Sequence, residues 1–294
     1  MTRRLYLSGF ALFLAVCPVV ADADTILYEG KSAFNNIIVT ENDRGMRTLE
    51  FEKGGARQSV VKLGDPDHLE LPYTRVAMTG LALCEDPRRV LVVGLGGGSI
   101  PMFLRKHYPK ATIDVVDIDP EVVQVAKKFF GFREDSRMRV HTADGRRFIE
   151  QCRQRYDIIF LDAFGTDSIP QHLATVEFLR SVRRALTPRG LVASNVWSRL
   201  RNRQYDAMVR TYQEAFSELY VIRIEGAGNV ILIALPRAER ITRTDLSKRA
   251  AAISKQHGFR FDLGELVSRG FQAAREKDSQ SRILTDQGKP NPRR

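Results

Sequence analysis

Short apolar runs alternate with amphipathic segments through residues 89–235. Runs such as 89–93 and 157–161 are continuous and mostly apolar, which is typical of parallel strands covered on both faces. A close pair of runs at 220–224 and 230–235 predicts a final hairpin. The pattern predicts an α/β fold, with a Rossmann-like sheet, helices on both faces and one antiparallel strand. The other expected strands are 112–116, 139–141 and 191–196, and the expected helices begin at Ser99 and after Asp144 or span 120–130, 176–186 and 204–216.

A glycine-dense loop follows the first strand of this sheet. Gly94, Gly96 and Gly98 give the pattern G-x-G-x-G, and a helix opens at Ser99. Glycines let backbone N–H groups approach a ligand, and a helix N-terminus adds a positive dipole end. The next strand ends on Asp117, whose carboxylate can accept hydrogen bonds from both ribose hydroxyls of a nucleoside. Because Ser99 occupies the third glycine position of the dinucleotide fingerprint, the spacing favours a cofactor of the S-adenosylmethionine type.

Acidic side chains also follow two further strands. Asp144 precedes Gly145 after the third strand, and Asp162 follows the fourth. Carboxyl ends of parallel strands gather at one edge of the sheet, so we expect both near Asp117. Asp144 has an alternative interpretation as a helix cap or turn former. Asp162 follows an apolar strand and is the best candidate for a catalytic carboxylate.

The flanking segments divide the chain into four parts. Residues 24–85 contain short strands at 25–28, 36–40, 47–51 and 58–61, then helix-like spacing over 69–83, and predict a small N-terminal β-rich domain. Residues 86–236 form the nucleoside-binding domain. Residues 237–294 are basic, with helices expected over 245–256 and 262–268, and 279–294 are expected to be partly disordered.

Residues 1–23 resemble a secretory signal peptide. Arg3 and Arg4 precede an apolar stretch over 5–20, and Ala-Asp-Ala at 21–23 offers a cleavage site. The chain is therefore expected to be exported to the periplasm or secreted. An uncleaved membrane anchor is the alternative, although the apolar run is short for a span. If the segment is misread, the protein is cytoplasmic.

The chain carries a formal net charge of +11, yet no nucleic-acid-binding motif accompanies the basic residues, so we expect no specific nucleic-acid binding. Outside residues 1–23 the cysteines are Cys84 and Cys152. Neither has the spacing of a metal site, and we expect buried thiols and no metal.

Motifs along most of the chain resemble the spermidine-synthase-like family of the class I methyltransferase fold. The segment S-A-F-N-N-I at 32–37 resembles the family's S-x-Y-Q-x-I, and V-D-I-D at 116–119 resembles its V-E-I-D. Asp162 matches the first aspartate of its D-S-x-D. The remaining matches are R-T-L at 47–49, Q-S at 58–59, L-P-Y at 71–73, D-G at 144–145 and I-L-T-D at 283–286.

This resemblance implies a role for each matching residue. The glycine loop, Asp117 and Ile118 would hold the nucleoside, Asp144 and Gly145 its adenine, and Asn35 stands where a glutamine touches it. Tyr73 and Asp162 would be catalytic, with Asp162 orienting or deprotonating an amine. The co-substrate would be decarboxylated S-adenosylmethionine, the acceptor a small amine such as putrescine, and the assembly a homodimer.

Several positions depart from the family pattern. Gly97 replaces the aspartate that would hold the aminopropyl ammonium, and Gly165 replaces the second acid of D-S-x-D, with Asp167 nearby. Thr74 stands in place of a histidine and Arg75 in place of an acid. Three interpretations therefore stay open: an aminopropyltransferase, an S-adenosylmethionine-dependent methyltransferase with an unknown methyl acceptor, and a non-catalytic nucleoside or partner binder. The whole-chain resemblance favours the first.

Overall fold

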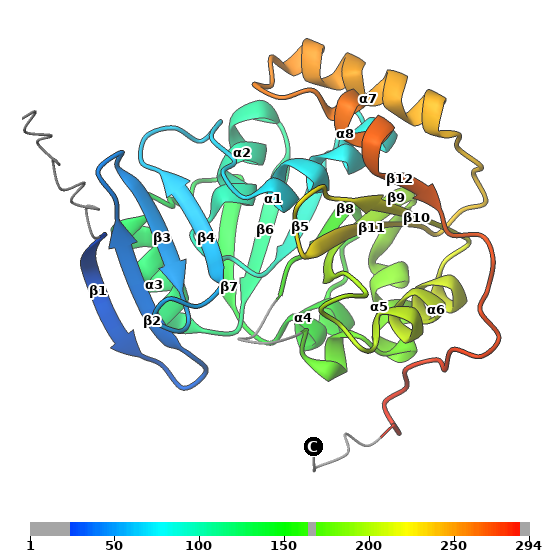
Figure 1. Cartoon of the computed structure of the whole chain (residues 1–294), viewed down its shortest axis with the longest axis horizontal. Helices are drawn as coiled ribbons and strands as arrows, with labels where there is room; N and C mark the ends of the chain where they lie inside the picture. The colour runs from blue at the N-terminus through cyan, green and yellow to red at the C-terminus, as the bar shows by residue number, and fades with distance from the viewer. Residues whose placement is uncertain (1–23, 164–168, 289–294) are drawn as a thin grey trace, which may run out of the picture.

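The computed structural model describes residues 24–163 and 169–288, which form two β-sheets with helices around the larger one (Figure 1). The smaller sheet is antiparallel, has the order β1-β2-β3-β4, and confirms the expected β-rich N-terminal segment. Its strands are Thr25–Lys31 (β1), Asn36–Glu41 (β2), Met46–Glu50 (β3) and Arg57–Lys62 (β4).

The larger sheet is eight-stranded, with the order β12-β10-β11-β9-β8-β5-β6-β7. Strands β9, β8, β5, β6 and β7 are parallel to one another. The chain runs from β5 to β7 in one direction and from β8 to β9 in the other, so the order reverses between β5 and β8. In such sheets the carboxyl ends of the strands at the reversal border a ligand crevice. The strands are Arg89–Val93 (β5), Thr112–Asp117 (β6), Met138–Thr142 (β7), Tyr156–Leu161 (β8), Leu186–Trp197 (β9), Glu218–Arg223 (β10), Asn229–Leu235 (β11) and Phe271–Ala273 (β12).

Two strands of this sheet run antiparallel to the others, not one. Strand β11 pairs antiparallel with β9 and β10, as the expected hairpin requires. Strand β12 then pairs antiparallel with β10. The expectation of a single antiparallel strand is wrong because three residues are too few to show a periodic pattern.

Helices cover both faces of the large sheet, as expected (Figure 1). One face carries Pro72–Ala77 (α1), Met78–Leu83 (η1, a 3₁₀ helix), Ser99–His107 (α2), Pro120–Phe129 (α3), Arg243–His257 (α7) and Leu263–Gly270 (α8). The other carries Gly145–Gln151 (α4), Val176–Ala185 (α5) and Tyr205–Ala215 (α6), with a short 3₁₀ turn at Gln171–Leu173 (η2). Within the described ranges, no helix has the length and apolarity to cross a membrane.

The small sheet is anchored on α3. Ile37, Leu49 and Val61 from the sheet form one apolar cluster with Val122 and Phe130 of the α3 segment. Burial of such side chains stabilises the contact by roughly 1.5–3 kcal/mol each. The packing holds the small sheet over the carboxyl end of β6, where α3 begins.

The segment before the C-terminus is packed against α5 and α6. Leu284 is only 6% exposed. Its N–H donates to Thr211 Oγ1 at 2.9 Å, and its carbonyl oxygen accepts the Val176 N–H at 2.8 Å. Residues of this segment therefore make packed contacts, while the expectation of partial disorder over 279–294 stays a prediction. Residues 289–294 lie outside the described part.

The two cysteines among the described residues, Cys84 and Cys152, form no disulfide. Cys84 and Cys152 are free thiols, each partly rather than fully buried. Burial raises the pKa of Cys84 to about 12, and burial likewise raises the pKa of Cys152. Both side chains are therefore thiols rather than thiolates at neutral pH, which suits a packing role.

Candidate active site

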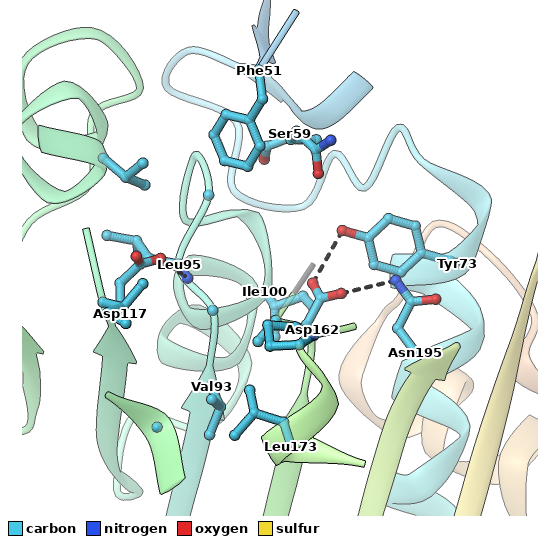
Figure 2. Close-up of a pocket in the computed structure, with 18 of the residues that line it drawn as sticks. Phe51, Ser59, Tyr73, Val93, Leu95, Ile100, Asp117, Asp162, Leu173 and Asn195 are labelled. Atoms are coloured by element: carbon cyan, nitrogen blue, oxygen red, sulfur yellow. Dashed lines mark hydrogen bonds between the residues drawn. The ribbon is translucent and has the colours of Figure 1, made fainter. Parts of the chain in front are cut away.

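A cavity of about 360 Å³ opens at the carboxyl ends of β5, β6, β7 and β8. The glycine loop and the strand ends form one wall, while Phe51 and Ser59 of the small sheet face them (Figure 2). Tyr73 of α1 and Asn195 of β9 lie at the end opposite Asp117. The large sheet, the small sheet and helix α1 therefore all contribute to the cavity. It lies where the strand order of the large sheet reverses.

The glycine loop lies directly over β8. Gly94 has φ +100°, and a Cβ there would lie 2.2 Å from the Asp162 carbonyl oxygen. Gly98 has φ +82° and begins α2, but it packs against Phe132 and does not line the cavity. Gly94 and Gly96 do line it. Gly96 also has a positive φ of +52°, so backbone geometry favours glycine at all three positions. Gly94 and Gly96 also leave room for a ligand to approach the loop backbone.

Asp117 is tied to the glycine loop. Its Oδ2 accepts the Leu95 N–H at 2.8 Å, and its Oδ1 accepts the Asp119 N–H at 2.9 Å. Burial raises the pKa of Asp117, against the lowering effect of these backbone N–H groups. Each oxygen keeps a lone pair free, so the carboxylate can still accept two hydroxyl groups from the cavity side.

The Asp144 carboxylate forms hydrogen bonds with two groups of the protein itself. Its Oδ1 accepts the Arg147 N–H at 2.9 Å, which caps α4, and its Oδ2 lies 2.8 Å from His172 Nε2. Burial raises the pKa of Asp144, but these two hydrogen bonds outweigh it and the net pKa is lowered. The helix-cap interpretation is confirmed, and Asp144 and Gly145 also line the cavity.

Asn35 and Ile118 lie at the mouth of the cavity. Asn35 ends a turn in which its N–H donates to Ser32 Oγ at 2.9 Å, and Ser32 Oγ in turn donates to Asp119 at 2.5 Å. Ile118 is 42% exposed, and Phe34 beside Asn35 is 50% exposed. These apolar side chains can contact the flat face of a base that enters the mouth.

Asp162 lies at the other end of the cavity, beside Gly94. Tyr73 donates its hydroxyl to Asp162 Oδ2 at 3.0 Å, and Asn195 Nδ2 donates to Asp162 Oδ1 at 2.9 Å (Figure 2). Burial raises the pKa of Asp162 to about 7, although the bonds from Asn195 and Tyr73 lower it. Burial beside the same carboxylate raises the pKa of Tyr73 well above its usual range. Asp162 can therefore gain and lose a proton near neutral pH.

Four polar residues that line the cavity were not indicated by the sequence: Arg57, His172, Asn195 and Asn229. Asn195 carries the one signal that was available, since its amide interrupts an otherwise apolar strand. His172 lies on a 3₁₀ turn with no periodicity. Asn229 begins β11, where a polar residue looks like part of a turn.

The departures from the family pattern lie in different places. Thr74 is buried and donates its hydroxyl to the Leu71 carbonyl at 2.7 Å, and Arg75 donates to the Glu70 carbonyl at 3.3 Å. Neither lines the cavity. Gly165 and Asp167 lie outside the described residues. Among the residues that are described, no group of three or more His, Cys, Asp or Glu side chains is arranged to hold a metal.

Comparison with known proteins identifies the family. Residues 71–224 match the model of the spermine/spermidine synthase domain. The chain belongs to the spermine/spermidine synthase family. A polyamine aminopropyltransferase of Vibrio vulnificus is 34% identical over 290 residues, an alignment that covers 95% of this chain and 96% of the relative. Membership makes the protein a transferase with the class I methyltransferase fold.

Methyltransferases of the same fold are also similar. An eEF1A lysine and N-terminal methyltransferase of Bos taurus is 35% identical over 210 residues, which covers 65% of this chain but only 30% of that protein. The crystal structure of human methyltransferase-like protein 13 in complex with SAH superposes with a TM-score of 0.58 at 35% identity, covering 64% of this chain and 93% of that chain. These two alignments cover about two thirds of this chain, whereas the aminopropyltransferase alignment covers nearly all of it.

Proposed function

We propose that the protein transfers an aminopropyl group from decarboxylated S-adenosylmethionine to a small amine such as putrescine. The observation that carries the proposal is the position of the Asp162 carboxylate at one end of the cavity. Its two oxygens accept hydrogen bonds from Tyr73 and Asn195. The polyamine aminopropyltransferase similarity along nearly the whole chain supports it.

Each cavity residue has a role that follows from its position. Asp117 binds the ribose hydroxyls, while Asp144 and the apolar mouth around Ile118 hold the adenine. The sulfonium of the donor supplies the leaving group. Asp162 accepts the proton that the attacking ammonium must lose, the amine nitrogen bonds to the carbon beside the sulfur, and that carbon–sulfur bond breaks to release methylthioadenosine. A base with a pKa near 7 can accept this proton and release it again at neutral pH.

The direct test is turnover with purified protein, decarboxylated S-adenosylmethionine and putrescine, with spermidine and methylthioadenosine measured by mass spectrometry. Equal amounts of both products are expected in the wild type. Asp162→Asn should bind the donor as the wild type does and turn over at least about a hundredfold more slowly, in line with the usual contribution of a general base. Absence of both products from the wild type would contradict the proposal.

Methyl transfer from intact S-adenosylmethionine is the second candidate. A Cβ on Gly97 would lie 2.8 Å from Phe130 and 2.9 Å from Ser59 Oγ, so the loop has no room for the family's aspartate. Arg57, two residues before Ser59, lines the same cavity. An arginine beside the cavity suits a methionine carboxylate better than it suits a lone ammonium.

Calorimetric titration with both donors separates the two candidates. Aminopropyl transfer expects tighter binding of the decarboxylated form, whereas methyl transfer expects tighter binding of the intact form. Arg57→Gln distinguishes them further, because it should weaken only the intact donor if the arginine holds the carboxylate. Binding of neither donor would favour the non-catalytic interpretation.

We also propose that residues 1–23 direct export and that the mature chain begins near Asp24. The support is the order of Arg3 and Arg4, the apolar run and the Ala-Asp-Ala site. N-terminal sequencing of protein from separated cell fractions tests this. An intact N-terminus in the cytosolic fraction would contradict export, and an intact N-terminus in the membrane fraction would favour the anchor.

We propose a homodimer as the working assembly, on the strength of the family resemblance. Light scattering coupled to size-exclusion chromatography of the mature chain should give twice the protomer mass. A protomer mass at micromolar concentration would contradict this proposal.

A further inference from the structure

A chain of hydrogen bonds leads away from Asp162 across two neighbouring strands. Asn195 Nδ2 donates to Asp162 Oδ1 at 2.9 Å, and Asn229 Nδ2 donates to Asn195 Oδ1 at 2.9 Å. Asn195 is 5% exposed, so its amide has little access to water. All three side chains line the cavity. Each bond in the chain points its hydrogen towards Asp162.

The two strands fix where the amides lie. Strands β9 and β11 pair antiparallel, with Asn195 opposite Ile231 and Asn229 opposite Trp197. Alternate residues of a strand point to the same face, so Asn195 and Asn229 occupy diagonal positions on one face of the sheet. Neither amide can therefore leave the other without a break in the ladder or a change of rotamer.

Asp162 and Asn229 together favour one orientation of the Asn195 amide. In the observed orientation, Asn195 gives its NH₂ group to the carboxylate and its carbonyl oxygen to Asn229. With the amide turned over, an oxygen would face the carboxylate oxygen and an NH₂ group would face the Asn229 NH₂ group. Two attractive contacts would become two repulsive ones, so the donor from Asn229 maintains the orientation.

We propose that Asn195 and Asn229 are positioning residues that keep the Asp162 carboxylate a hydrogen-bond acceptor aimed at the substrate amine. The proposal rests on the role of Asp162 given above as the group that takes the amine proton. A donor on each carboxylate oxygen, from Tyr73 and Asn195, leaves the other lone pairs free for the amine. The Asn229–Asn195 pair thereby favours the ionised form that a general base requires.

Few titratable or charged groups among the described residues lie close to the Asp162 carboxylate. Tyr73 from α1 is the titratable group in contact with Asp162 among the described residues, and Gly94 on the β5 side offers only backbone. From η2, His172 is paired with Asp144. Asp117 and Arg57 line the cavity without contacting Asp162. Tyr73 and Asn195 thus contact Asp162 directly, and Asn229 acts on it through Asn195.

The test is a pH titration of Asp162 by NMR in the full chain labelled at aspartate Cγ, with Asp162→Asn used to assign the signal. Asn195→Leu should raise the titration midpoint by about one pH unit or more, because a hydrogen bond to the charged form is lost. Asn229→Leu should raise it by about half as much, because Asn195 stays but is free to turn. Gln272→Leu, a matched change at the exposed position of β12, should leave the midpoint unchanged.

An unchanged midpoint in Asn229→Leu would overturn the proposal, as would a lowered midpoint in Asn195→Leu. Asn229→Ser repeats the test with a smaller side chain should the leucine variant unfold. In turnover assays the acid limb of the pH profile should move with the midpoint while the KM for the donor stays the same. Because the NMR titration needs no substrate, it decides the positioning role even if neither aminopropyl nor methyl transfer is found.

Discussion

A Cβ added to Gly94 would lie 2.2 Å from the carbonyl oxygen of Asp162. The first glycine of the loop and the candidate base are therefore in backbone contact, and the Asp162 N–H also donates to the Val93 carbonyl at 2.8 Å. The contact joins the end of β5 to the end of β8 at the point where the strand order reverses. The glycine loop and Asp162 cannot shift independently of each other.

Gly94→Ala should separate these two elements. The new methyl group would overlap the Asp162 backbone, and alanine disfavours the φ of +100°. We expect a loss of about 3 kcal/mol or more in the free energy of unfolding, measured by urea denaturation. Gly45→Ala is the matched control, because Gly45 has φ +69° with no atom within 4 Å of its added Cβ. A loss equal in the two variants would show that the contact with Asp162 is unimportant.

Asp117→Asn should weaken donor binding without unfolding the protein. The amide keeps one oxygen for the Leu95 or Asp119 N–H but presents NH₂ to the other, and it loses the charge that favours ribose hydroxyls. We expect the Kd of the preferred donor to rise at least about tenfold in calorimetry, the usual effect of losing a charge-assisted hydrogen bond. Asp157→Asn, on the same sheet but away from the cavity, should leave the Kd unchanged. Unaltered affinity in Asp117→Asn would contradict the ribose role.

The raised pKa of Asp162 predicts how stability depends on pH. Between pH 4 and 7 the folded state keeps the proton that the unfolded state has lost, so the wild-type free energy of unfolding falls as pH rises towards about 7. Asp162→Asn cannot ionise and removes this fall. Relative to the wild type, its free energy of unfolding should rise by about 4 kcal/mol from pH 4 to pH 8. A constant difference across that range would show that Asp162 titrates normally.

Turnover should depend on pH in the opposite sense. If Asp162 must be ionised to take the amine proton, kcat should increase with pH through about 7. The acid limb should be measured at saturating donor, so that binding does not contribute. Loss of activity as pH rises through 7 would contradict a basic role for Asp162.

Leu284→Ala should destabilise the protein although it lies ten residues from the C-terminus. Its side chain is packed against the α5 and α6 face of the sheet, and burial of a leucine of this kind contributes about 2–4 kcal/mol. Leu200→Ala is the matched control, since Leu200 is 97% exposed. Thermal unfolding of the two variants checks the prediction, and an equal Tm for both would show that the segment contributes little.

Most of the sheet could be predicted because buried parallel strands are continuous apolar runs. The strands at 89–93 and 157–161 show this, and the glycine loop with Asp117 is a local arrangement that the sequence order itself specifies. The predicted position of Asp162 near the loop follows from the same logic, since successive strand ends share one edge. A position at this edge of the sheet does not by itself specify which ligand a residue binds.

The missed features depend on contacts between distant segments. Asn195 acquires its role only because Asn229 returns beside it on β11, and His172 only because η2 brings it to Asp144. Strand β12 is too short, and Leu284 too isolated, to give a periodic hydrophobic pattern in the sequence. Their positions are set by tertiary packing. The lack of space at Gly97 likewise depends on Phe130 and Ser59, which come from α3 and β4.

The packing of the last described residues also supports one wall of the cavity. Gln171 Nε2 donates to the Gly288 carbonyl at 2.8 Å, and Arg146 forms a bidentate pair with Asp286 at 2.7 and 2.6 Å. These contacts support η2, and η2 in turn carries His172 to the cavity. The cavity wall around His172 therefore depends on a residue that lies 117 positions further along the chain than its partner Gln171.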